Sequence, residues 1–415
     1  MGGLSIVFFL SSEWSHYHRP GLLRAIARGQ KDHGPVLVVN NPICSLSTRW
    51  HRPQRWQQWC ERDRHAPPLQ TIADNLVMLD ARIALHDKLA SQLPGAGRLN
   101  RHLLAPQVHA AMQALGMRHP LVSWFQFPTF CHYPGMLQEP LALYECYDEH
   151  ADVPGLSAHA KRHMKDLEKR LLQACDLVFT TSLPLFETRR QVHPNVALTY
   201  NGADLAFFAP IGQDSLHKAT RQRNAAPTVG YLGTIHEHTD LTLLADMAQQ
   251  CPDWRLVLVG PVQKGADAQQ LARLRSAPNV TLHGWVEEAD LIHILRAIDV
   301  GVIPYRSDAE FNRYVNPNKL HEYTAMGKPV VASPGIDVSS HTGMVRTAQG
   351  ATAFIQAVRE AHATNSPERV QERLQFAVGN SWDARAALML GHIHRTLQAD
   401  PVRTAPPYPP EATPS

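Results

Sequence analysis

Residues 304–333 read PYRSDAEFNRYVNPNKLHEYTAMGKPVVAS, a polar loop followed by a helical pattern and a short apolar run. Asn316 can cap a helix, and Pro317 suits its first turn because the missing N–H is not needed there. The pattern predicts a helix over Lys319–Met326 and a buried strand over Pro329–Ser333. Loop, helix and strand in this order are typical of a parallel α/β sheet.

The start of this predicted helix carries residues suited to a nucleotide. Backbone N–H groups and the helix dipole bind phosphate at such a position. Lys319 lies in the first turn, where a lysine is unfavourable for the helix alone and a bound diphosphate offsets that cost. Glu322 lies on the same face, where its carboxylate can accept hydrogen bonds from two ribose hydroxyls. The alternatives are a solvent-facing lysine and a capping or surface glutamate.

Short apolar runs alternate with helical patterns through most of the chain. Runs that are apolar at every position indicate strands buried on both faces, as in parallel sheets covered by helices. They form two series, which predicts two Rossmann-like domains. The expected strands are Ser5–Leu10, Val36–Asn40, Leu76–Leu79, Leu121–Phe125, Leu141–Tyr144 and Leu177–Thr180 in the first series, and Thr228–Leu232, Arg255–Gly260, Val280–Leu282, Val300–Pro304 and Pro329–Ser333 in the second.

A polar stretch without periodicity, between Pro210 and Pro227, sets the predicted domain boundary. We therefore expect one domain over residues 1–209 and another over residues 210–380. An amphipathic helix follows over residues 381–399. The many prolines of residues 400–415 predict a disordered tail.

Several classes of protein are disfavoured by what the sequence lacks. The six cysteines form no CxxC pair, which argues against a structural zinc site and a disulfide framework. The 24 histidines sit singly without an HExxH pattern, so no metal site is assigned. Neither a GxGxxG after a first strand nor a GxxxxGK[ST] is present, which disfavours dehydrogenases and P-loop phosphotransferases. No apolar run approaches the roughly 18 residues of a membrane span, and the apolar N-terminus is interpreted as a first strand.

The second half contains five further segments in a fixed order: GYLGTI at 230–235, WRLVLVGP at 254–261, HGWV at 283–286, DVGVIPY at 299–305 and KLHEYTAMGKPVV at 319–331. The first half adds Trp14, RPGLL at 19–23, TS at 181–182 and YNGAD at 200–204. Together they resemble the GT-B glycosyltransferases of group 1, in the GT4-like branch that makes bacterial exopolysaccharide, capsule or teichuronic acid.

The resemblance implies a GT-B fold, in which the parallel sheets of two Rossmann-like domains face each other across a cleft. It implies that residues 1–209 bind the acceptor, residues 210–380 bind the nucleotide sugar, and the helix over 381–399 crosses back to the first domain. The expected activity is transfer of a sugar from a nucleotide-diphosphate sugar to a glycan or polyprenyl-linked acceptor, without a metal or cofactor.

The same resemblance assigns roles to donor-side residues. Lys319 is expected to contact the diphosphate and to stabilise the leaving group in catalysis, and Glu322 to hold the ribose. The other donor-binding candidates are backbone positions beside the phosphates, the base or the helix start: Gly233, Thr234, Gly284, Trp285, Val286, Asn318 and Leu320. The sequence departs from many relatives in the loop after strand 228–232, where His236 to His238 replace a basic residue. It also departs at Tyr314, where many relatives carry an acid.

The first domain is expected to supply the acceptor side. The strand near Leu141–Tyr144 leads to Asp148, Glu149 and His150, and a carboxylate at a strand end can deprotonate an acceptor hydroxyl. Asp148 is the first choice for the base, with Glu149 and His150 as further candidates; the alternative is a polar turn without chemistry. Further acceptor-side or secondary candidates are Trp14, His16, Arg19 and Arg313.

Lysines and arginines outnumber acidic residues between Arg19 and Arg118, and tryptophans interleave with arginines over residues 49–59. Such a surface suits either a lipid headgroup interface or ordinary packing beneath a loop. We therefore expect a cytoplasmic protein, leave peripheral contact with the inner membrane surface open, and expect no nucleic-acid partner. The rival functions are a nucleotide-sugar epimerase on the same fold and a non-catalytic nucleotide-sugar binding protein.

Overall fold

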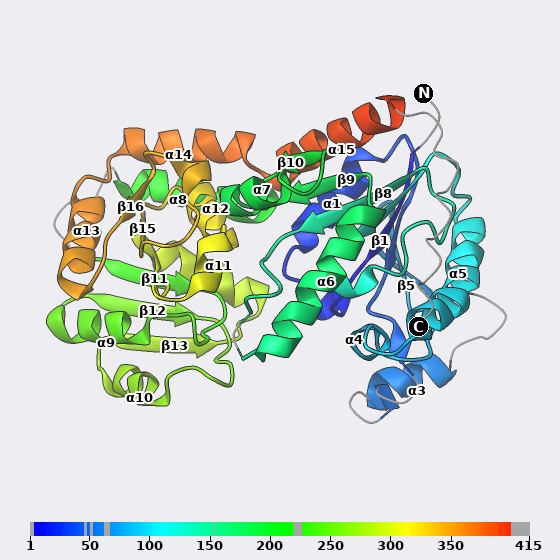
Figure 1. The fold of residues 1–415 in the computed structure, drawn as a ribbon. Coiled ribbons are helices and arrows are strands. Elements are labelled where there is room, and N and C mark those ends of the chain that lie inside the picture. The colour runs from blue at the N-terminus through cyan, green and yellow to red at the C-terminus, as the bar shows by residue number, and fades with distance from the viewer. Residues whose placement is uncertain are drawn as a thin grey trace. The chain divides into compact units, whose positions relative to one another are not determined.

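The computed structural model describes residues 4–44, 48–49, 53–61, 67–153, 155–219 and 226–399, which form two compact units (Figure 1). The N-terminal unit contains the chain up to Thr180, Leu185–Thr199 and the chain from Ala386 onward. The C-terminal unit contains Thr181–Pro184 and Tyr200–Arg385.

The N-terminal unit is built on an eight-stranded sheet of order β10-β9-β8-β7-β1-β2-β5-β4. Every neighbouring pair is parallel except β4 and β5, which form an antiparallel pair at one edge. The strands are β1 (Ser5–Phe9), β2 (Val36–Val39), β4 (Leu69–Ala73), β5 (Leu76–Leu79), β7 (Leu121–Phe125), β8 (Leu141–Cys146), β9 (Leu177–Thr180) and β10 (Val196–Leu198), with a small separate sheet of β3 (Ile43–Cys44) and β6 (Arg82–Ile83).

The helices of this unit connect the strands as crossovers. They are η1 (Trp14–His16), α1 (Pro20–Gly29), α3 (Pro53–Glu61), α4 (Asp87–Ala90), α5 (Ala96–Ala114), η2 (Pro128–Phe130), α6 (Ala158–Ala174), α7 (Leu183–Arg189) and α15 (Trp382–Ala399). From Ala386 onward, α15 belongs to the N-terminal unit. Aromatic side chains fill the centre: the Phe9 and Phe125 rings stack at 4.9 Å, and Phe8 meets Trp124 at 5.2 Å.

The C-terminal unit has a six-stranded parallel sheet of order β13-β12-β11-β14-β15-β16. Its strands are β11 (Thr228–Leu232), β12 (Arg255–Val259), β13 (Val280–Gly284), β14 (Val300–Ile303), β15 (Val330–Ala332) and β16 (Val345–Thr347). Its helices are α8 (Leu205–Ala219), α9 (Leu241–Gln250), α10 (Ala268–Ser276), α11 (Glu288–Ala297), η3 (Glu310–Tyr314), α12 (Asn318–Ala325), η4 (Ser339–His341), α13 (Ala351–Ala363) and α14 (Pro367–Gly379).

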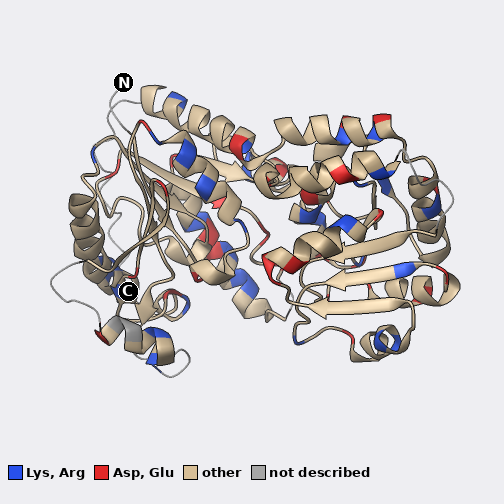
Figure 2. Ribbon diagram, turned by 180° about the vertical axis from the view of Figure 1, so that it is seen from behind, with Lys and Arg blue, Asp and Glu red and all other residues tan. Residues whose placement is uncertain are grey.

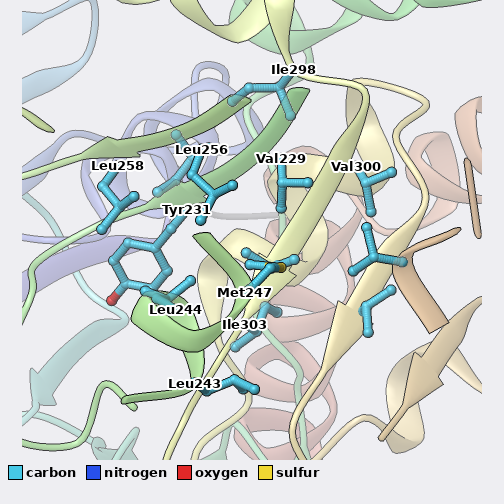
Figure 3. Close-up of a cluster of buried hydrophobic side chains, with 14 of the residues drawn as sticks. Val229, Tyr231, Leu243, Leu244, Met247, Leu256, Leu258, Ile298, Val300 and Ile303 are labelled. Atoms are coloured by element: carbon cyan, nitrogen blue, oxygen red, sulfur yellow. The ribbon is translucent and has the colours of Figure 1, made fainter. Parts of the chain in front are cut away.

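These helices pack in two groups. Helix α9 contacts α10 and α13, and α8 contacts α11, α12 and α14, so that both faces of the sheet are covered. Figure 3 shows the resulting core around Val229, Tyr231, Leu244 and Met247, which are at most 1% exposed. Strands buried on both faces explain why their sequences are apolar at every position.

Helix α12 lies unusually close to the sheet, because glycines face it. A Cβ atom built on Gly301 of β14 would approach the Tyr323 ring to 2.5 Å, closer than such atoms come. The buried Tyr323 hydroxyl donates a 2.7 Å hydrogen bond to the carbonyl of Gly230 and accepts a 2.9 Å bond from the N–H of Leu232. These contacts join the last turn of α12 to β11.

The expected strands and their parallel arrangement are confirmed in both units. The apolar runs do not predict the antiparallel edge strand β4 or the short strands β3, β6, β10 and β16. The predicted boundary at residue 210 is wrong, because the C-terminal unit contains Thr181–Pro184 and the chain from Tyr200 to Arg385. Helix α8 spans that boundary and packs on α14, so the polar stretch begins inside a helix. Residues 400–415 lie outside the described residues.

The predicted capping role of Asn316 is also wrong. Pro317 is the cap residue of α12 and no side chain caps the helix. The Asn316 amide instead donates to the carbonyl of Asp337 at 2.9 Å, and its oxygen lies 2.8 Å from Nε2 of His321. A buried amide has to satisfy its own donors and acceptor, and these partners leave it none for the helix.

Replacing Tyr323 with Phe should lower the free energy of unfolding by about 1–3 kcal/mol, because the buried N–H of Leu232 loses its acceptor. Urea denaturation followed by circular dichroism measures this. Tyr314→Phe is the control, since Tyr314 is only partly buried and should lose little. Equal stability of the Tyr323→Phe and wild-type proteins would show that the Tyr323 hydroxyl does not hold α12 on the sheet.

Candidate donor and acceptor sites

Three glycines lie together where the strands of the C-terminal sheet end. The N–H of Gly233, just after β11, donates to the Val259 carbonyl at 2.8 Å, and the N–H of Gly260 donates to the Gly284 carbonyl at 2.7 Å. A Cβ atom on Gly260 would lie 2.2 Å from the carbonyl oxygen of Gly233, so no side chain fits there. Backbone therefore lines this glycine edge, where ligands of open α/β sheets bind.

Lys319 lies beside this glycine edge, in the first turn of α12. Its side chain is buried, and Nζ donates hydrogen bonds to the hydroxyls of Tyr305 at 2.7 Å and Tyr231 at 3.3 Å. The ammonium also lies 4.4 and 4.6 Å from the centres of the Tyr231 and Tyr305 rings. A Cβ atom on Gly233 would be 3.3 Å from Nζ, so the charge lies directly under exposed backbone.

No carboxylate among the described residues forms an ion pair with Lys319. Two tyrosine rings and hydroxyls compensate its charge only in part, because cation–π contacts are worth about 0.5–2 kcal/mol. A buried ammonium without a counter-ion is costly. An anionic ligand above Gly233 would supply one.

Glu322 follows one turn along α12. Burial raises the pKa of its carboxyl to about 7, and nearby Lys319 acts in the opposite direction. In the part of the chain that the structure describes, the carboxyl group accepts no hydrogen bond. A desolvated carboxyl without donors favours a ligand that brings hydroxyl groups, as a ribose does.

His236 is a site residue to which sequence reasoning assigned no role of its own. It lies in the loop after β11, and its Nδ1 accepts the N–H of His238 at 3.1 Å, so that Nε2 carries the hydrogen in the neutral ring. Burial, with the positive charge of Lys319, lowers the pKa of His236 to about 4. A neutral N–H donor thus stands where many relatives carry a basic residue.

The remaining donor-side candidates differ in what they expose. The carbonyl of Thr234 accepts the Tyr231 hydroxyl at 2.7 Å, which fixes the loop after β11. Trp285 is 69% exposed beside Gly284. The Leu320 side chain is in the core, so that only its backbone could contact a ligand, and its N–H bonds the Pro317 carbonyl at 3.0 Å. Arg313 is exposed in η3.

On the N-terminal sheet, Asp148 follows β8 at the carboxyl end of the strands. Burial raises the pKa of its carboxyl to about 7, while Arg19 lowers it and Glu149 raises it further. No described residue donates a hydrogen bond to this carboxyl. A carboxyl group with a pKa near neutrality and open oxygens suits general base catalysis.

Neighbouring charges are already paired. Arg19 is 2% exposed, and its Nη1 lies 2.8 Å from Glu145, which also accepts hydrogen bonds from Trp124 and Gln126. Arg19, expected as an acceptor-side or secondary residue, is instead part of a buried structural ion pair. Glu149 likewise pairs with Arg189 at 2.7 Å, which leaves Asp148 as the uncommitted carboxyl of this turn.

The other acceptor-side candidates flank this region in the sequence. The backbone N–H of Trp14 donates a hydrogen bond to the Asn40 side-chain oxygen at 3.0 Å, and Trp14 is partly buried. His16 is exposed, with its Nδ1 3.0 Å from Oγ of Ser15. His150 is buried, its ring centre 4.6 Å from that of Phe127. Burial lowers the pKa of His150 to about 4, so it is neutral at pH 7.

The raised pKa of Asp148 predicts a pH-dependent contribution to stability. The folded protein holds this proton more tightly than the unfolded chain, so the contribution is complete below about pH 4 and is lost as the pH rises through about 7. Asp148→Asn should therefore gain stability relative to wild type between pH 5 and pH 8, as measured by urea unfolding. The exposed Asp166→Asn is the control, and a constant difference for Asp148→Asn across this range would refute the raised pKa.

Two observations bear on metals and membranes. Among the residues described, no group of three or more histidines, cysteines and acids could hold a metal ion. No helix within the same residues is both long and apolar enough to cross a membrane.

Residues 226–364 match the family model of the group 1 glycosyl transferases, which covers the glycine edge, Lys319 and Glu322. The chain is also 27% identical over 271 residues to TuaH of Bacillus subtilis (strain 168), a glycosyltransferase assigned to teichuronic acid biosynthesis. That match covers 61% of this chain and 66% of TuaH, just under two thirds of the relative.

Solved structures share the fold over nearly the whole chain. Sucrose-phosphate synthase from Thermosynechococcus elongatus has a TM-score of 0.64 at 19% identity, covering 96% of this chain and 99% of its own. Anabaena Alr3699/HepE in complex with UDP has a TM-score of 0.60 at 14% identity, covering 95% and 100%. These findings show a group 1 glycosyl transferase domain over residues 226–364 and, for the chain as a whole, the GT-B fold of its structural neighbours.

Proposed function

We propose that the protein transfers a sugar from a uridine-diphosphate sugar to an acceptor hydroxyl. The observation that carries the proposal is the Lys319 ammonium beneath the Gly233 backbone, which has no ion-pair partner among the described residues and lies one turn from the open carboxyl of Glu322. This spacing matches a diphosphate joined to a ribose. HepE was solved with UDP and with UDP-glucose, and that similarity supports uridine as the base.

In the proposed reaction, the acceptor hydroxyl forms a bond to the anomeric carbon while the bond from that carbon to the diphosphate breaks. The leaving diphosphate gains negative charge, which Lys319 and the N–H groups at the start of α12 stabilise. His236 can donate its Nε2–H to the same group. These fixed donors replace the charge stabilisation that a metal ion would supply, so we propose a reaction without a metal or other cofactor.

The acceptor proton passes to Asp148 in this proposal. A base on the face opposite the leaving group inverts the anomeric configuration. If the leaving phosphate takes the proton instead, the configuration is retained, and Asp148 is dispensable. Trehalose-6-phosphate synthase, a structural neighbour of 12% identity, transfers its glycosyl group with retention, which makes the stereochemistry of the product a sharp test of the role of Asp148.

The acceptor is proposed to be a glycan or polyprenyl-linked sugar in the synthesis of a surface polysaccharide. Support comes from TuaH, which is assigned to teichuronic acid biosynthesis. Lipid-linked acceptors lie at a membrane surface, so a protein that uses them has to approach it.

Helices α4 and α5 of the N-terminal unit offer a surface for that approach. Leu99 and Leu103 are 48% and 41% exposed on α5, and Leu89 and Leu93 near α4 are 47% and 46% exposed. A groove of about 410 Å³ on α5 is lined by basic and imidazole side chains, namely Arg98, Arg101, His102 and His109. Leucines beside cationic residues suit an anionic lipid surface.

The tryptophan segment at residues 49–59 is a weaker candidate for the same role. Trp50 and Arg52 lie outside the described residues. Arg55 is committed to ion pairs with Glu13 and Asp80, at 2.7 and 2.8 Å, so its charge is already compensated within the protein.

Replacing Glu322 with Ala should weaken UDP binding roughly 10- to 100-fold, because hydrogen bonds to a charged group are worth about 1.5–3 kcal/mol. Isothermal titration at pH 8 measures this, with the exposed Glu288→Ala as control. Unchanged affinity would remove Glu322 from the donor site. Conversion of a UDP-sugar to another UDP-sugar without release of UDP would identify an epimerase instead.

The Asp148→Asn variant tests the acceptor side of the proposal independently of nucleotide binding. It should leave UDP affinity unchanged and reduce turnover by about 10²–10⁴-fold. Full activity with retained configuration would exclude Asp148 as the base and leave the proposed donor chemistry intact.

The α4–α5 surface predicts binding to vesicles of phosphatidylglycerol and phosphatidylcholine, but not to phosphatidylcholine alone. Leu99→Ser with Leu103→Ser should reduce sedimentation with anionic vesicles, since burial of each half-exposed leucine in lipid is worth about 1 kcal/mol. Val192→Ser, equally apolar and 68% exposed elsewhere in the unit, is the control. Undiminished sedimentation of the double variant would exclude this surface.

A further inference from the structure

A second polar cavity lies in the C-terminal unit, where the strands begin rather than end. It has a volume of about 200 Å³ and is lined by Val330 at the start of β15, Val345 at the start of β16 and the ends of α13 and α14 that meet there. The glycine edge and Lys319 lie past the opposite ends of the strands. Because β15 and β16 are parallel to the rest of the sheet, this cavity is separate from the donor site.

Three arginines line this cavity: Arg346 of β16, and Arg369 and Arg373 on successive turns of α14. No aspartate or glutamate is among its lining residues. Figure 2 shows blue basic bands along α14 together with red acidic ones, and the acidic residues of α14 do not line the cavity. Arg346 also forms an exposed ion pair with Glu360 at 3.3 Å, outside the lining, which in water is worth little.

Arg373 is the buried member of the set, at 7% exposed. Its Nε donates to the Gly327 carbonyl at 2.9 Å, and its Nη2 donates to the Asn365 side-chain oxygen. Both acceptors are neutral, and within the described residues no carboxylate lies within ion-pair distance. Burial, followed by repulsion from Arg369, lowers the pKa of Arg373 to about 10, while the nearby Glu372, which does not line the cavity, acts in the opposite direction.

Arg369 adds a second unfavourable charge. It lies in the first turn of α14, where its N–H donates to Oγ of the cap residue Ser366 at 3.4 Å. A positive side chain in a first turn opposes the helix dipole, which favours anions there. The cavity therefore gathers three like charges and a positive helix end, with no acid among its lining residues to neutralise them.

We propose that this cavity binds a phosphate group, either as inorganic phosphate or as a phosphate monoester. Guanidinium groups bind phosphate oxygens in pairs of parallel hydrogen bonds, which fits arginines better than lysines. The cavity is smaller than the roughly 300–1,000 Å³ of pockets for drug-sized ligands, so a nucleoside diphosphate is excluded. Binding would tie β15, β16 and α14 together without contacting the donor.

The test is a thermal unfolding titration of the full chain with inorganic phosphate, at constant ionic strength set with sodium chloride. Wild type should show a saturable rise in Tm, because a ligand that binds only the folded state stabilises it. Arg346→Gln with Arg369→Gln should shift the half-saturating concentration at least tenfold upward. Neither side chain is buried, so the variant should fold, and Arg373 is left intact. Arg296→Gln, on the exposed face of α11, is the matched control.

Two further arms identify the source of the anion and exclude the donor site. Glycerol 3-phosphate should act like phosphate if monoesters are accepted, and its failure would assign the site to the free ion. The titration is repeated with saturating UDP, which should leave the phosphate effect in place. Three results would overturn the proposal: UDP abolishes the rise in Tm, the double variant shows the same rise as wild type, or chloride alone produces it. These results do not depend on Glu322 or Asp148, so they test the phosphate site separately from the proposed function.

Discussion

The proposed donor site depends on one buried charge. The Lys319 ammonium lies in the first turn of α12, contacts two tyrosine hydroxyls and two aromatic rings, and has no carboxylate partner among the described residues. A positive charge in this place is unfavourable both for burial and for the helix dipole. An anion at the glycine edge relieves both costs, which is why the electrostatics of the site already suit a bound diphosphate.

Packing of α12 against the sheet positions the Lys319 ammonium. Gly301 lets the Tyr323 ring press against β14, and the Tyr323 hydroxyl joins α12 to β11. Close packing of helix on sheet brings Lys319 under the Gly233 backbone rather than into solvent. Gly260 and Gly233 approach so closely that only backbone can occupy the edge, and backbone leaves room for phosphate. Core packing and ligand binding are thus two consequences of the same glycine positions.

Much of this could be predicted from the sequence. Fully apolar runs indicated the parallel strands because a strand buried on both faces has no polar positions. The motif around Lys319 and Glu322 indicated the donor helix, since its spacing places both on one face. The Asn316 cap and the boundary at residue 210 could not be predicted correctly. Both depend on tertiary partners, Asp337 and His321 for Asn316 and α14 for α8, which local sequence does not reveal.

The pairing of charges was equally hidden from the sequence. Arg19 reads as a free cation in a loop, yet it is buried against Glu145, 126 positions away. Arg373 reads as one more charge on a polar helix, yet it is buried without an acid as ion-pair partner among the described residues. Contacts between residues far apart in sequence determine which charged side chains form ion pairs within the protein and which remain available for a ligand.

The most direct measurement is a crystal structure of the protein with a bound UDP-sugar. The proposed donor site predicts diphosphate oxygens within hydrogen-bond distance of Lys319 Nζ, over the Gly233 backbone, with both ribose hydroxyls on the Glu322 carboxylate. A nucleotide bound elsewhere, or one bound while Lys319 contacts only its two tyrosines and Glu322 touches no hydroxyl, would contradict it.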